Sequence, residues 1–114
     1  MSYSNIMDLN IPYIDKIIPL IVSVAAPDQI ILFGSYARGD NREKSDVDLL
    51  ILKKGLKGGN KIIDNIYKAF YENKIGIPVD LLTLDYNRYL ELNNEIGYVY
   101  KTIKEEGKVI YGLL

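Results

Sequence analysis

Residues 31–51 read ILFGSYARGDNREKSDVDLLI, in which two short apolar segments flank a polar one. The first apolar segment covers residues 29–33 and the second covers residues 47–52. A short, continuous apolar run rich in Ile and Leu is typical of a strand that is covered on both faces. Gly34-Ser35 follows the first run directly, and one helical turn fits after it. The stretch therefore predicts a strand, a helical turn and a second strand.

The segment before this stretch has the spacing of a helix. Its apolar residues between positions 11 and 25 recur three and four positions apart, as one buried helix face requires. Asn10 is suited to the N-cap position. Because Pro19 removes a helix hydrogen bond, we expect either a kink there or two short helices end to end. Pro27 then ends the segment.

The segments that follow residue 52 predict a helix, a third strand and two more helices. Residues 61–73 form an amphipathic helix, and residues 77–84 form an apolar run that predicts the third strand. Asp85 can cap a helix that extends to about residue 93. A last helix begins near Ile96 and stops at Gly107, before a short apolar tail.

Length and composition restrict both the fold and the chemistry. The chain has 114 residues, which suits a single domain over residues 1–114. The order of elements predicts the α/β (α+β) class, with a small mixed sheet and helices packed on it. There is no Cys and no His, which excludes thiol nucleophiles, disulfides, Cys or His zinc sites and Ser-His-Asp triads. Any metal must be bound by oxygen ligands, and any general base must be a carboxylate, a Lys or a Tyr.

Charge and hydropathy indicate the expected cellular location of the protein and the partners that it is expected to lack. With 15 acidic and 14 basic residues the formal net charge is -1, which argues against nucleic acid as a partner. No apolar run approaches the roughly 20 residues of a membrane span. The N-terminal sequence lacks the basic and apolar regions of a signal peptide. We expect a soluble cytoplasmic protein without a membrane partner, and a homo-oligomer remains open.

Gly34 and Ser35 are candidates for binding phosphate. A helix that begins directly after a strand presents free backbone N–H groups and the positive end of its dipole. Glycine allows a close backbone approach, and the Ser hydroxyl adds a donor. The alternative is that Gly-Ser is only a turn after a strand.

Asp46 and Asp48 are candidates for binding a divalent cation. They flank Val47 at the start of the second strand, so both carboxylates point to the same face. Two like charges near 6 Å repel by roughly 3 kcal/mol at an effective dielectric constant of 20, and a cation would relieve that repulsion. Alternatively, one Asp caps a turn and the other pairs with Arg38, Arg42 or Lys44.

Asp80 is an acid in the middle of the apolar third strand, where an unpartnered carboxylate is unusual. If the second and third strands are neighbours, Asp80 joins Asp46 and Asp48 in one carboxylate cluster, as a two-metal site requires. Asp85 is a competing candidate, but its place before YNRYLEL suits a helix cap better.

The same residues resemble a known signature. Gly-Ser, a ten-residue spacer and Asp-x-Asp in an apolar strand are similar to the nucleotidyltransferase superfamily related to DNA polymerase β. More narrowly, GSYARGD, the small size and the distal VDLLTL resemble the minimal nucleotidyltransferases (MNT type), which often act as antitoxins to a HEPN-domain partner. The resemblance implies the polymerase β-like fold.

The resemblance also implies roles for these residues. Gly34 and Ser35 would bind the phosphates of the nucleotide, and Asp46 and Asp48 would hold Mg²⁺. Asp80 would be the third carboxylate, which ligates the catalytic metal and helps to deprotonate the attacking hydroxyl. Two Mg²⁺ ions and ATP are therefore expected.

We expect the chain to transfer AMP from ATP to a hydroxyl, and the resemblance suggests a tyrosine of a HEPN-type toxin. Arg38 would either contact the triphosphate or steady the carboxylates as a structural ion pair. Two other functions remain open. The chain could be an antitoxin that only masks its partner, or a small-molecule nucleotidyltransferase of the aminoglycoside type.

Overall fold

The computed structural model describes residues 9–92 and 98–112. Helices and strands follow one another along the chain as α1 (Ile14–Ala25), β1 (Gln29–Phe33), α2 (Ser35–Arg38), β2 (Val47–Lys53), α3 (Gly59–Glu72), β3 (Val79–Asp85), α4 (Tyr86–Glu91), α5 (Tyr98–Glu106) and β4 (Lys108–Gly112).

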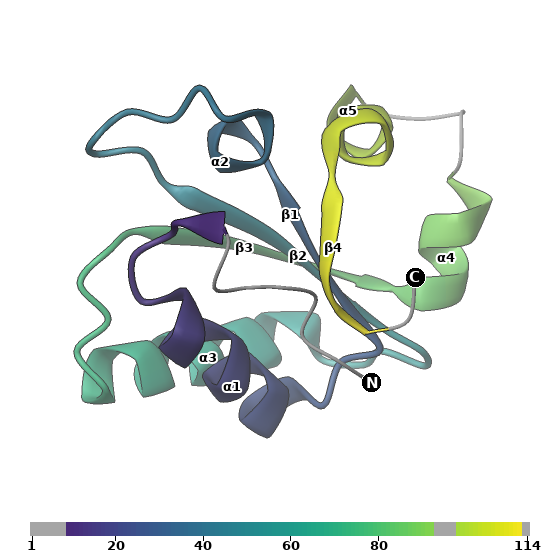
Figure 1. Cartoon of the computed structure of the whole chain (residues 1–114). Helices are drawn as coiled ribbons and strands as arrows, with labels where there is room; N and C mark the ends of the chain where they lie inside the picture. The colour runs from purple at the N-terminus through teal and green to yellow at the C-terminus, as the bar shows by residue number, and fades with distance from the viewer. Residues whose placement is uncertain (1–8, 93–97, 113–114) are drawn as a thin grey trace.

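The four strands form one mixed sheet in the order β3-β2-β1-β4 (Figure 1). β1 runs antiparallel to both β2 and β4, whereas β2 and β3 are parallel. Antiparallel pairing places the end of β1 beside the start of β2, and Phe33 is opposite Asp48. The parallel pair β2–β3 needs a crossover, which α3 provides. The expected class, a small mixed sheet with flanking helices, is confirmed.

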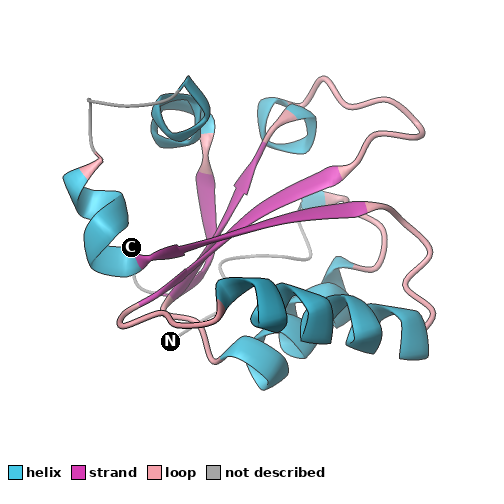
Figure 2. Ribbon diagram, turned by 180° about the vertical axis from the view of Figure 1, so that it is seen from behind, coloured by secondary structure: helices cyan, strands magenta, loops and turns pink. Residues whose placement is uncertain are grey.

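Helices cover both faces of the sheet, as Figure 2 shows from behind. α1 and α3 lie on one face, where Ile17, Ile18 and Ile66 pack against alternate strand residues such as Leu49. On the opposite face, Tyr89 of α4 and Ile103 of α5 pack against the other set, which includes Leu50. Since both sets of strand residues are buried, the strands have the continuous apolar sequence that predicted them.

The N-terminal helix begins later than its sequence indicates. Asn10 has a φ of 51°, and Tyr13, which occupies the N-cap position, has a φ of 65°. Asn10 is therefore not the cap. One helix runs continuously through Pro19, so the alternative of two short helices is wrong. The fully buried Ile17, Ile18 and Ile21 offset the hydrogen bond that Pro19 removes.

The C-terminal apolar tail is a strand, which the sequence analysis missed. β4 pairs with β1, about 80 residues earlier in the chain, and a short apolar run does not reveal such a distant partner. α4 ends at Glu91, while its expected end near residue 93 and the expected start of the last helix near Ile96 lie outside the described residues. None of the helices in the described ranges has the length and apolar character needed to cross a membrane.

Candidate active site

Asp48 and Asp80 are register partners on the parallel strands β2 and β3. The backbone N–H of Val47 donates to the carbonyl of Pro78 at 2.9 Å, so the two strands begin together. Val47 and Val79 are buried on the face covered by α1 and α3, which leaves the alternate positions, Asp48 and Asp80, on the other face. The expectation that these strands are neighbours is confirmed.

Burial and neighbouring carboxylates raise the pKa of Asp48 and of Asp80. The pKa of Asp48 is raised to about 6. Partial burial is the largest cause, followed by the negative charges of Asp80 and Asp46 and a hydrogen bond with Asp80. The charge of Arg38 acts in the opposite direction on the same pKa. Burial, followed by the charge of Asp46, also raises the pKa of Asp80. The side chains of Asp46, Asp48 and Asp80 are therefore close enough to interact electrostatically, and we call these three residues the carboxylate cluster.

The donor atoms of the carboxylate cluster are of the kind that binds a hard cation. Its donors are carboxylate oxygens, the ligands that Mg²⁺ prefers, and a cation would relieve the repulsion that raises the pKa of Asp48. Within residues 9–92 and 98–112, no group of three or more acidic side chains is arranged so that it could hold a metal ion by itself. Mg²⁺ does not need such a cage, because it is usually bound by one or two carboxylates together with substrate phosphates.

Gly34 connects β1 to α2 directly beside Asp48. Its φ of 75° lies in the region that favours glycine. A Cβ atom built on Gly34 would also overlap with Oδ2 of Asp48. Any other residue here would strain the backbone and displace the carboxylate. Ser35 is the first residue of α2, so the Gly-Ser pair adjoins the carboxylate cluster.

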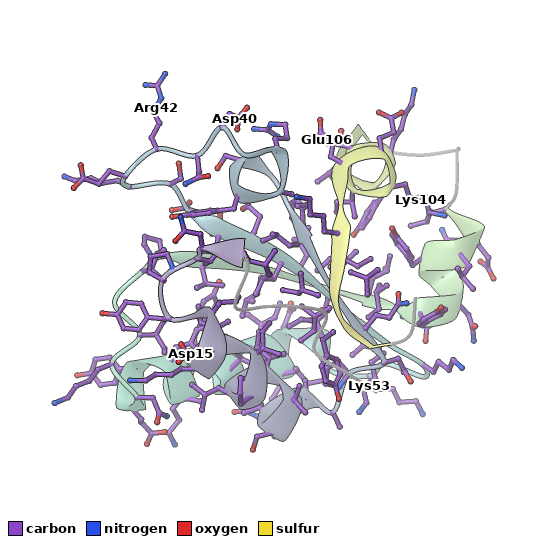
Figure 3. The ribbon with its side chains drawn as sticks, viewed as in Figure 1. Asp15, Asp40, Arg42, Lys53, Lys104 and Glu106 are labelled. Atoms are coloured by element: carbon purple, nitrogen blue, oxygen red, sulfur yellow. The ribbon has the colours of Figure 1, made fainter. Side chains whose placement is uncertain are left out.

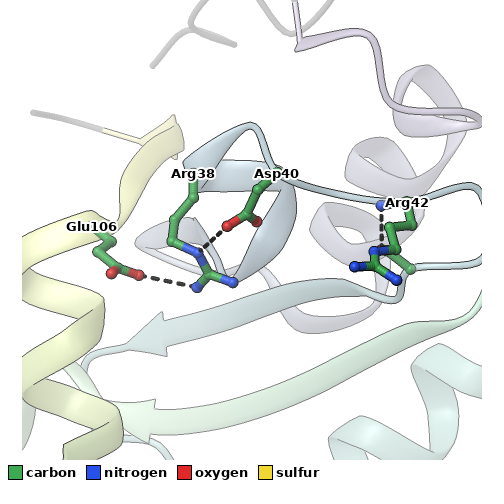
Figure 4. Close-up of polar contacts among 5 residues, drawn as sticks. Arg38, Asp40, Arg42 and Glu106 are labelled. Carbon is green, nitrogen blue, oxygen red and sulfur yellow. Dashed lines mark hydrogen bonds and ion pairs between the residues drawn. The ribbon is translucent and has the colours of Figure 1, made fainter.

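Arg38 lies in α2 and forms two ion pairs at its guanidinium (Figure 4). Nε donates to Oδ2 of Asp40 at 3.0 Å, and Nη1 donates to Oε2 of Glu106 at 3.2 Å. The side chain is 42% exposed, and these bonds use two of its five N–H donors. Among the described residues Arg38 forms ion pairs with Asp40 and Glu106, and none with Asp46, Asp48 or Asp80, while a phosphate contact through the remaining donors stays a prediction.

Among the described residues no basic side chain forms a salt bridge with Asp46 or Asp48, although the charge of Arg38 favours the ionised form of Asp48. The salt bridges between described residues join Arg38 to Asp40 and Glu106, and Arg88 to Glu91. Arg42 instead lies in a turn, where its backbone N–H donates to Oγ of Ser45 at 2.7 Å.

Glu106 is a site neighbour that the sequence analysis missed. It lies at the end of α5, 68 residues after Arg38, and no local pattern connects the two. Figure 3 shows Asp40 and Glu106 at the end of the molecule formed by α2 and α5, far from Lys53.

Asp85 is a structural residue, as its sequence context predicts. It caps α4 by accepting from the backbone N–H of Arg88 at 3.0 Å. It also accepts from the backbone N–H groups of Gly55 at 2.7 Å and Leu56 at 3.3 Å. The bond from Arg88 contributes most to lowering the pKa of Asp85. Asp85 lies at the other end of β3 from Asp80 and takes no part in the carboxylate cluster.

A small mixed sheet with a Gly-Ser turn beside paired aspartates is the arrangement of polymerase β-like nucleotidyltransferases. The model of the family described as polymerase beta, nucleotidyltransferase matches residues 15–112. The chain belongs to this family and is a nucleotidyltransferase.

Two relatives come from Methanocaldococcus jannaschii, and both have the provisional name of protein adenylyltransferase. One is 36% identical over 84 residues, covering 73% of this chain and 77% of the relative. The other is 32% identical over 82 residues, covering 62% of this chain and 73% of the relative.

Solved structures share the fold. A toxin–antitoxin complex with AMP-PNP contains a chain with a TM-score of 0.62 and 24% identity, covering 87% of this chain and 73% of that one. A complex of the tri-AMPylated HEPN toxin of Shewanella oneidensis with an MNT antitoxin gives a TM-score of 0.50 and 22% identity, covering 87% and 69%.

Proposed function

We propose that this chain is a Mg²⁺-dependent protein adenylyltransferase that moves AMP from ATP to a tyrosine hydroxyl of a HEPN-type toxin and thereby acts as an antitoxin. One observation carries the proposal. Asp48 pairs with Asp80 across β2 and β3, beside the Gly34-Ser35 turn. The relatives named as protein adenylyltransferases and the structural neighbour with an AMPylated toxin support this choice of nucleotide and acceptor.

Asp46, Asp48 and Asp80 would hold two Mg²⁺ ions, which neutralise phosphate charge and favour in-line displacement at the α-phosphorus. Gly34 and Ser35 would bind the leaving phosphates through backbone N–H groups and the Ser hydroxyl. Arg38 would contact the same phosphates through the guanidinium donors that Asp40 and Glu106 do not use.

Asp80 is suited to accept the proton of the attacking hydroxyl. The chain contains no His, so carboxylates, Lys and Tyr are its available bases. Burial and the charge of Asp46 raise the pKa of Asp80, which makes it a better base than an ordinary carboxylate. The attacking tyrosine hydroxyl would lose its proton to a carboxylate oxygen of Asp80 as its oxygen bonds to the α-phosphorus, while the bond between the α-phosphorus and the bridging oxygen breaks and pyrophosphate leaves.

Label transfer tests this proposal directly. The chain is incubated with Mg²⁺, the HEPN-domain product of the adjacent gene and ATP labelled at either the α- or the γ-phosphate. We expect α-label on a toxin tyrosine, identified by mass spectrometry, and no γ-label. Asp46→Asn and Asp48→Asn should each abolish transfer. Asp64→Asn, an exposed carboxylate on α3, is the matched control and should leave it unchanged.

Two results would overturn the proposal. If wild type transfers no label with Mg²⁺ or Mn²⁺ yet still silences the toxin, the chain is a masking antitoxin. If label moves to an aminoglycoside or another small hydroxyl compound and never to protein, the chain is a small-molecule nucleotidyltransferase.

A further inference from the structure

Tyr67 of α3 reaches the free edge of the sheet. In the sheet formed by the described residues, β3 is an edge strand with β2 on one side only. The Tyr67 hydroxyl donates to the carbonyl of Val79 at 2.7 Å and accepts from the backbone N–H of Leu81 at 3.2 Å. One hydroxyl therefore bonds to the backbone groups on both sides of Asp80.

This contact gives hydrogen-bond partners to two outward backbone groups of β3, the Val79 carbonyl and the Leu81 N–H, on either side of Asp80. Successive residues of a strand direct their backbone groups to opposite sides, so Asp80 faces β2 while Val79 and Leu81 face outward. Outward groups of an edge strand have no strand partner, and such strands are prone to local opening. The Tyr67 hydroxyl takes the place of the missing strand at these two groups.

The side chain is held firmly enough for this role. The Tyr67 ring packs edge-on against Phe70, with ring centroids 6.1 Å apart and planes at 81°. Val79 and Leu81 are both buried on the face that α3 covers. Although Tyr67 is 39% exposed, both functions of its hydroxyl, donor and acceptor, are used. Phenylalanine would keep the ring contacts and lose both bonds.

We propose that Tyr67 is a positioning residue that fixes the β3 backbone around Asp80 and thereby holds the Asp80 carboxylate against Asp48. This inference rests on the proposed function, in which Asp80 is the third carboxylate. Electrostatics supports the proximity. Burial raises the pKa of Tyr67, and the charges of Asp80 and Asp46 raise it further, so the phenol lies within electrostatic range of both carboxylates.

Tyr67→Phe tests the proposal, with Tyr71→Phe as the matched control. Tyr71 lies one turn later on the same helix and is 86% exposed. In Tyr67→Phe we expect kcat to fall about tenfold while KM for ATP stays within about twofold, because misplacing a reacting group mainly slows chemistry. In an Asp80→Asn background, Tyr67→Phe should add no further loss. Tyr71→Phe should match wild type.

Two readouts do not depend on catalysis. Hydrogen exchange at the Leu81 amide should be faster in Tyr67→Phe and unchanged in Tyr71→Phe. Mn²⁺ alone, followed by paramagnetic broadening of the Asp80 amide resonance, should require about fivefold more metal for half-maximal broadening in Tyr67→Phe.

The outcomes separate the two proposals. Faster exchange at Leu81 with unchanged kcat and unchanged Mn²⁺ dependence would show that Tyr67 only protects a sheet edge, and would overturn the positioning role. An equal loss of kcat in the Asp80→Asn background would overturn it as well. If wild type transfers no label, the proposed function fails, and the Mn²⁺ titration still decides whether Tyr67 positions Asp80.

Discussion

The parallel strands β2 and β3 have charged residues at matched register positions at both ends. Asp48 is opposite Asp80 at the start of the pair, and Lys53 is opposite Asp85 at its end. At the start, partial burial and the negative charges of neighbouring carboxylates raise the pKa of Asp48 to about 6. At the end, hydrogen bonds from backbone N–H groups lower the pKa of Asp85.

The far end uses its charges to join segments. Lys53 Nζ donates to the carbonyl oxygens of Ala25 at 2.8 Å and Ala26 at 3.1 Å, which close α1. Asp85 caps α4 and binds the loop after β2. Charges that meet backbone dipoles stabilise the fold, whereas carboxylates that face other carboxylates weaken it until a cation or proton arrives. The difference separates an end of the sheet whose charges stabilise the fold from the end that carries the proposed active site.

The largest expected effect comes from Asp48→Asn. Transfer activity should fall at least about 10³-fold, because a metal-binding carboxylate supplies several kcal/mol of transition-state stabilisation. Thermal stability should be unchanged or rise by up to about 4 °C, since the amide removes repulsion that solvent already screens. Activity assays and thermal melts of the same preparation measure both. A large drop in the melting temperature would mean that Asp48 is structural.

Asp85→Ala should show the reverse pattern. Loss of the α4 cap and of the acceptor for Gly55 and Leu56 should lower the free energy of unfolding by about 1–2 kcal/mol. Below the melting transition, kcat should stay within about twofold of wild type. Urea denaturation combined with steady-state kinetics measures this, and a tenfold loss of kcat in fully folded protein would contradict the contrast between the two ends.

The pH dependence of stability should have opposite signs at the two ends. The pKa of Asp48 is near 3.8 in the unfolded chain and about 6 in the folded one. The resulting stabilisation is fully present below pH 3.8 and is lost as the pH rises through about 6. Relative to Asp48→Asn, wild type should therefore lose up to about 1 kcal/mol between pH 4 and pH 7 after allowance for solvent screening. The lowered pKa of Asp85 contributes stability that is present at neutral pH and is lost on acidification below its unfolded pKa. Urea titrations that extend from neutral pH to below the unfolded pKa of Asp85 test both signs, and parallel curves for wild type and Asp48→Asn would contradict the first.

Glu106→Gln should produce the smallest effect. The change removes the ionised acceptor of Arg38 Nη1 and leaves the bond to Asp40. An exposed pair contributes less than about 1 kcal/mol, so KM for ATP should change by at most about threefold with kcat unaffected. The adjacent, exposed Glu105→Gln is the control. Equal KM values in the two variants would show that Glu106 does not influence nucleotide binding.

Much of the fold could be predicted from sequence because its signals are local. The strand predicted at residues 29–33 has the same bounds as β1, and the Gly-Ser turn into α2 was predictable from residue types alone. Asp85 was also identifiable as a cap from its place before a helical pattern. Predictions failed where distant parts of the chain decide. The alternative of two helices meeting at Pro19 is wrong because buried isoleucines maintain one helix, and β4 was missed because its partner is the first strand.

The sequence by itself excluded His and Cys chemistry, since it contains neither residue, and it determined that Asp46 and Asp48 follow a Gly-Ser pair at a fixed spacing. Only the tertiary structure decided that β3 lies parallel to β2 with Asp80 opposite Asp48, that Glu106 binds Arg38, and that Tyr67 bonds to the strand around Asp80. The physical reason is that spacing along a chain sets which residues share a strand face or a helix turn. Contacts between distant residues depend instead on strand register and helix packing, which are set when the whole core is buried.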